Sequence, residues 1–107
     1  MDSRQSELIA VLDKLIDLLA SDDQRHWAAQ MSESKRRLVS SDHSGVEYLL
    51  ASYGGMGSFN DLIIHQSSED GEFSWKPGYE RANEKLDKLR NRAWELANEI
   101  SRRQQFT

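Results

Sequence analysis

The sequence predicts an all-α domain, and three observations carry that prediction. Apolar residues recur at spacings of three and four over long stretches near both ends of the chain, as in amphipathic helices. A single proline, Pro77, leaves room for long uninterrupted helices. Glycine and polar punctuation is concentrated between residues 40 and 78. We therefore expect residues 1–107 to form one domain, a small bundle of four main helices with a glycine-rich turn and a long loop before the C-terminal helix.

The first helix is expected at about residues 3–20. Its apolar positions cover about half of the helix circumference; they are Leu8, Ile9, Val11, Leu12, Leu15, Ile16, Leu18 and Leu19. So wide a face indicates a helix that is central to the bundle or partly exposed for a partner. Because a small monomer could leave such a face uncovered, we expect a homodimer.

The second helix is expected to begin after Ser21, which with Gln24 has the spacing of a capping box. Its buried positions are expected to be Trp27, Ala28, Met31 and Leu38. A third, short helix begins at Ser44, where Glu47 completes another capping-box pattern, and it ends at Gly54.

Residues 65–77 are expected to form a loop that Phe73 and Trp75 hold against the body of the domain. The last helix should run from Pro77 or Gly78 to Arg103. Its apolar seam alternates spacings of four and three through Ala82, Leu86, Leu89, Ala93, Leu96 and Ile100. Two pairs of opposite charge four residues apart should support it, Glu84 with Lys88 and Glu99 with Arg103.

The segment from Tyr53 to Ile64 is the most unusual part of the sequence. Three glycines within four residues require positive φ angles or a close approach of another group. Ser58 and Asp61 have the spacing that caps a short helix. The apolar residues 62–64 could continue a helical turn or form a short strand, and we favour the helical turn.

Three roles are open for this turn. It could be a tight connection between helices, a protein-binding surface, or an anion site built on main-chain N–H groups. The anion site is the weakest, since the segment has no P-loop lysine and follows no clear strand. If the turn is a binding site, its residues are Tyr53, Gly54, Gly55, Met56, Gly57, Ser58, Asn60 and Asp61.

Catalysis and metal binding find no support in the residue pattern. The chain has no cysteine and no serine in a Gly-x-Ser-x-Gly elbow. The histidines, His26, His43 and His65, fall in three different segments without ligand spacing. We expect no catalytic residue, no metal site and no cofactor, and so no enzyme.

Charge and composition narrow the choice of partners and compartment. The net charge of −4 argues against a nucleic-acid partner, which would favour a basic face. No apolar stretch approaches the length of a membrane span, and the first residues do not resemble a signal peptide. Together with the absence of cysteine, this predicts a cytoplasmic protein that does not bind membranes.

The segment Tyr53-Gly54-Gly55-Met56-Gly57-Ser58-Phe59-Asn60-Asp61-Leu62 resembles a family of small bacterial helical domains of unknown function. The likeness extends loosely from the first helix to Leu96 and Ala97. It implies an accessory or immunity protein encoded near a bacterial toxin, and it supplies no reaction. We therefore expect a non-catalytic protein-binding domain, in particular one that occludes a basic toxin. The alternative is a small-ligand or nucleotide-binding domain that uses the glycine-rich turn.

Overall fold

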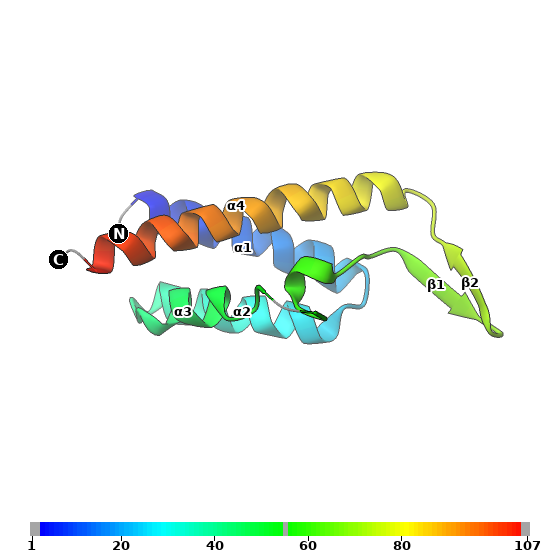
Figure 1. Cartoon of the computed structure of the whole chain (residues 1–107), viewed down its shortest axis with the longest axis horizontal. Helices are drawn as coiled ribbons and strands as arrows, with labels where there is room; N and C mark the ends of the chain where they lie inside the picture. Colours follow the sequence, from blue (N-terminus) through cyan, green and yellow to red (C-terminus); the bar gives the residue numbers. More distant parts are fainter. Residues whose placement is uncertain (1–2, 55, 106–107) are drawn as a thin grey trace.

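The computed structural model describes residues 3–54 and 56–105, and it confirms a mostly helical fold with four α-helices (Figure 1). A small two-stranded sheet, which the sequence did not predict, is added to them. The elements in order are α1 (Ser3–Ser21), α2 (Arg25–Val39), α3 (Ser44–Leu50), the 3₁₀ turn η1 (Phe59–Asp61), β1 (Gln66–Glu69), β2 (Glu72–Trp75) and α4 (Tyr79–Gln105).

Helix α1 is the central helix of the bundle. It packs against α2 and against α4, which cover it from two sides (Figure 1). Its fully buried positions are Leu8, Leu12, Leu15 and Leu19, with Ile9, Ile16 and Leu18 partly buried against the same core. The wide apolar face of α1 is therefore used within one chain. The homodimer stays a prediction, but α1 no longer supplies the reason for it.

Neither predicted capping box forms. Ser21 is the last residue of α1, and its hydroxyl donates to the Leu18 carbonyl (2.7 Å). The chain then reverses through Asp23, which has a φ of +59°, so Ser21 lies too early to cap α2. At α3, the Asp42 carboxylate accepts the main-chain N–H of Ser44 (2.9 Å). An aspartate two residues upstream thus replaces the predicted Ser44–Glu47 exchange.

Residues 66–75 form a β-hairpin, so the prediction of a loop was wrong there. Asp70 and Gly71 both have positive φ, +54° and +78°, as a two-residue type I′ turn requires. The hairpin projects from the end of the bundle opposite the chain termini (Figure 1). Phe73 is 58% exposed and does not hold the hairpin to the bundle. Trp75 does so in part, because its ring stacks on Tyr79 at 4.7 Å.

Helix α4 follows the predicted seam closely. It begins at Tyr79, just after the Pro77-Gly78 turn, and buries Leu86, Ala93, Leu96 and Ile100, with Ala82 and Leu89 partly buried. The Glu84–Lys88 pair forms, with 3.2 Å between charged atoms. Glu99 instead pairs with Arg4 of α1 (2.7 Å). No helix in the described part of the chain has the length and apolar character to cross a membrane.

Candidate functional site

The glycine-rich turn has the backbone that its composition predicts. Gly54 and Gly57 have φ angles of +89° and +78°, and Gly55 lies outside the described residues. The short helical turn follows as η1, with the Ser58 hydroxyl accepting from the Asn60 N–H (3.3 Å). The Asp61 carboxylate accepts the Gly57 N–H (2.8 Å). After η1, residues 62–64 belong to neither helix nor strand.

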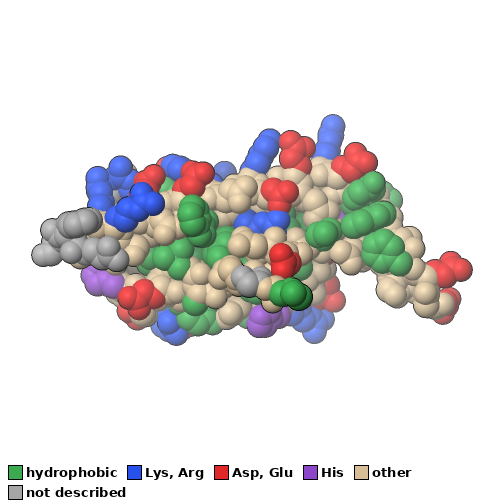
Figure 2. Space-filling model, viewed as in Figure 1, with side chains coloured by type: hydrophobic (Ala, Val, Ile, Leu, Met, Phe, Trp, Pro, Cys, Tyr) green, Lys and Arg blue, Asp and Glu red, His purple; other side chains and the backbone are tan. Residues whose placement is uncertain are grey.

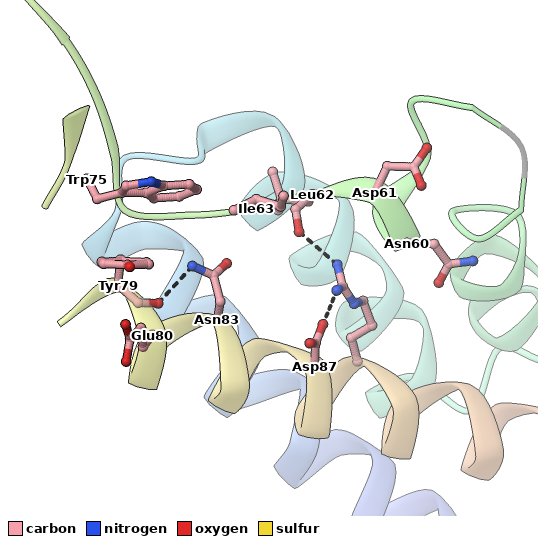
Figure 3. Close-up of a pocket in the computed structure, with 10 residues that line it drawn as sticks. Asn60, Asp61, Leu62, Ile63, Trp75, Tyr79, Glu80, Asn83 and Asp87 are labelled. Atoms are coloured by element: carbon pink, nitrogen blue, oxygen red, sulfur yellow. Dashed lines mark hydrogen bonds and ion pairs between the residues drawn. The ribbon is translucent and has the colours of Figure 1, made fainter. Parts of the chain in front are cut away.

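Arg90 of α4 binds the main chain of this irregular segment on its buried side. Its side chain is buried, and its Nη1 donates to the main-chain carbonyls of Phe59 (2.8 Å) and Leu62 (3.0 Å). Its Nη2 pairs with Asp87, one turn earlier on α4 (Figure 3). One buried guanidinium therefore satisfies both carbonyls where η1 ends and the extended chain begins.

Asn83 and Asp22 hold the next residues of the segment in a similar way, and we call Arg90, Asn83 and Asp22 together the clamp. The Asn83 side chain accepts the N–H of Ile64 (2.9 Å) and donates to its carbonyl (3.0 Å), as a neighbouring strand would. The buried carboxylate of Asp22, at the end of α1, accepts the N–H of His65 (3.0 Å). His65 has a φ of +64°, and Asp22 thus fixes a strained residue at the base of the hairpin.

Aromatic side chains anchor the segment in the core. The Phe59 ring is fully buried, with ring centres 5.1 Å from Trp27 and 5.7 Å from Tyr53. The Tyr53 hydroxyl donates to the carbonyl of Arg90 (2.7 Å). Burial raises the pKa of the Tyr53 phenol, so this donor keeps its proton at physiological pH. Tyr53 is thus a structural residue.

The clamped segment forms a ridge at the surface, made of Asp61, Leu62 and Ile63, with a groove on each side. The first groove, of about 550 Å³, lies between the ridge and α4 and is closed at one end by Trp75 (Figure 3). The second, of about 400 Å³, lies between the ridge and α2, beside Trp27. Ile63 on the ridge is 48% exposed and Trp75 is 41% exposed. Two large apolar side chains therefore face solvent around a fixed backbone.

The first groove is acidic as well as apolar. Asp61, Glu80 and Asp87 line it, and Arg90, the cation among its lining residues, already bonds to Asp87 and to two carbonyls. The neighbouring Glu80 carboxylate raises the pKa of the Tyr79 phenol. The groove would therefore attract a cation and repel a phosphate.

The structure places the described members of the predicted binding site in three different settings. Gly57, Ser58, Asn60 and Asp61 line the grooves. Tyr53 faces the core, whereas Gly54 and Met56 are exposed on the turn. The groove residues that the sequence did not point to are Leu62, Ile63, Trp75, Tyr79, Glu80, Asn83, Asp87, Arg90, Gln24, Trp27 and Gln66.

One signal in the sequence could have identified part of the clamp. Asn83 and Arg90 are seven residues apart and directly follow seam positions Ala82 and Leu89, so they share one helix face beside the core. Polar residues at that register need partners inside the fold. Asp22 has no comparable signal, because its partner lies 43 residues away.

The three histidines lie apart in the fold as they do in the sequence. His26 packs edge-on against Trp27, His43 contacts Gln104, and His65 lies beside Asp22. Within residues 3–54 and 56–105, no three histidine, aspartate or glutamate side chains gather in a way that could hold a metal ion.

Comparison with known protein families places part of the chain in a described family model. Residues 20–72 match the model of a domain of unknown function, DUF6966. The matched stretch begins at the end of α1 and includes the glycine-rich turn, η1 and the ridge. It is consistent with the expected uncharacterised family, and it names no reaction or partner. No curated protein and no solved structure matches the chain.

Proposed function

We propose that this chain is a non-catalytic domain that binds another protein through the ridge and the two grooves beside it. The observation that carries the proposal is the clamp. The side chains of Arg90 and Asn83 make four hydrogen bonds with the main chain of a segment without regular secondary structure, and the Asp22 carboxylate accepts a fifth. Together these bonds fix the segment. A surface fixed in advance costs little conformational entropy when a partner binds.

The chemistry of the surface indicates the kind of partner. Exposed Ile63 and Trp75 offer apolar anchors, and Met56 on the adjoining turn is fully exposed. The carboxylates of Asp61, Glu80 and Asp87 form an acidic rim. Apolar anchors inside a charged rim are typical of protein interfaces, and an acidic rim favours a basic partner. A bacterial immunity protein that occludes the active surface of a basic toxin fits this description.

The alternative, a phosphate or nucleotide site on the glycine-rich turn, has less support. An anion site there would need free main-chain N–H groups. The Gly57 N–H is taken by Asp61, and the Asn60 N–H is taken by Ser58. The Asp61 carboxylate also lines both grooves and would repel a phosphate.

Replacing Ile63 with aspartate is expected to abolish partner capture while leaving the fold intact. The side chain is half exposed on the ridge, so a charge there spoils an apolar contact without entering the core. The test is affinity capture from the native host, quantified by mass spectrometry, with the wild type and the Ile63→Asp variant as baits.

Val39→Asp is the matched control, because Val39 is 53% exposed and lies at the end of α2, outside both grooves. The proposal predicts a stoichiometric protein retained by the wild type and the control and lost by Ile63→Asp. Equal retention by all three baits would remove the ridge as the binding surface.

A further inference from the structure

The free end of the hairpin carries acidic side chains that have no cationic partner in the part of the chain that the structure describes. Glu69 and Glu72 face each other as a directly opposed pair, and Asp70 lies in the turn between them. Figure 2 shows acidic side chains gathered at the projecting end of the molecule. None of the three forms an ion pair among the described residues. Opposed like charges destabilise a strand pair unless a cation lies near them.

A groove on another face of the molecule has the opposite character. It lies between α1 and the first half of α4, has a volume of about 470 Å³, and is lined by Lys14, Arg81, Glu84, Lys85, Lys88 and Leu89. Only Lys88 of its four cations is paired, with Glu84. In the described part of the chain, nine lysines and arginines form ion pairs with acidic side chains, and Lys88 is the one of these nine that lines the groove. Unpaired cations are therefore concentrated in this groove, although the chain is acidic overall.

We propose that the acidic hairpin end of one copy docks in the basic groove of a second copy, and that two copies exchange hairpins around a twofold axis. The unpaired charges on the two surfaces are complementary. The unpaired Arg81 and Lys85, together with the paired Lys88, lie within eight residues of helix, a rise of about 10 Å, which matches the short span of the hairpin end. Hairpin and groove both adjoin the start of α4, so one twofold axis can satisfy both contacts.

The hairpin buries little of its own surface, so contact with a partner would stabilise it. All residues of β2 are exposed, and an isolated two-stranded hairpin is only marginally stable in water. Phe73 contacts Trp75 edge-on at 5.1 Å, yet the Phe73 side chain is 58% exposed. A second copy would cover the Phe73 ring, which lines neither groove beside the ridge, as well as neutralise the charges. This dimer uses surfaces other than the ridge, so it stands or falls independently of the proposed function.

The test is a charge exchange measured by sedimentation velocity. Glu69→Lys with Glu72→Lys reverses the charge of the hairpin end and leaves the turn residues in place. Arg81→Glu with Lys85→Glu reverses the charge of the groove. At roughly 100 micromolar protein, where micromolar affinities are saturated, we expect a dimer for the wild type and a monomer for each variant alone. A monomer at that concentration means that the dissociation constant rises from the micromolar to the millimolar range, about a thousandfold, in each case.

Mixing the two variants should restore a dimer of one copy of each, because both contacts are then again between opposite charges. Arg102→Glu, which removes an exposed cation at the far end of α4, should dimerise like the wild type. Circular dichroism serves as the control that every variant is folded. A wild type that stays monomeric, variants that still dimerise, or a mixture that stays monomeric would each overturn the proposal.

Discussion

Replacing Arg90 with methionine is expected to lower the free energy of unfolding by about 3–5 kcal/mol, because the main-chain carbonyls of Phe59 and Leu62 lose their donor and become unsatisfied. Methionine keeps much of the side-chain volume, so the change reports mainly on the hydrogen bonds. Urea unfolding followed by circular dichroism measures the effect.

Arg92→Met is the matched control two residues along the same helix. Arg92 is more exposed and pairs with Glu7 (2.6 Å) and Glu95 (3.2 Å) at the surface. Surface ion pairs contribute about 0–1 kcal/mol, so this variant should stay close to the wild type. Similar losses in the two variants would show that Arg90 acts only as a surface charge and that the clamp is unimportant for stability.

Replacing Phe59 with alanine is expected to cost about 3–5 kcal/mol, as for other fully buried aromatic side chains. The ring fills the space between Trp27 and Tyr53, and its removal leaves a cavity beneath η1. The same unfolding measurement applies. Phe73→Ala, measured in high salt to suppress association, should change stability by less than about 1 kcal/mol, since Phe73 is exposed. A loss for Phe59→Ala no greater than for Phe73→Ala would contradict the packing described.

The helices could be predicted from the sequence because their signal is local and repeated. The leucine spacing of α1 and the seam of α4 each extend over several turns, and the structure buries those positions. Helix ends were less predictable. A serine with a suitable residue three positions later is a local pattern, but at Ser21 the preceding helix simply continued.

The hairpin was missed because its strands lack the apolar alternation that usually marks a strand. Residues 66–69 are all polar, and only Phe73 and Trp75 alternate in the second strand. Asp70-Gly71 between them is a favoured dipeptide for a two-residue type I′ hairpin turn, even though polar residues surround it. With little core to bury, the turn chemistry determines the structure of this segment.

The candidate site was predictable only in part. The glycines indicated an unusual backbone, and the positive φ of Gly54 and Gly57 confirms it. The residues that hold that backbone, Asp22, Asn83 and Arg90, come from helices distant in sequence, and their bonds depend on how those helices pack. Local spacing can mark Asn83 and Arg90 as polar residues beside the core, but it carries no information about which groups they contact.

Hydrogen exchange at the amides of Ile64 and His65 tests the central claim, a ridge fixed by side chains, most directly. Both N–H groups are bonded to side chains, Asn83 and Asp22, and both lie outside any helix or strand. The clamp predicts that these amides exchange slowly in the wild type, and that Asn83→Ala makes Ile64 exchange at least about tenfold faster while the α1 amide of Leu15 keeps its protection. Exchange of Ile64 and His65 in the wild type as fast as in an exposed loop would contradict the account.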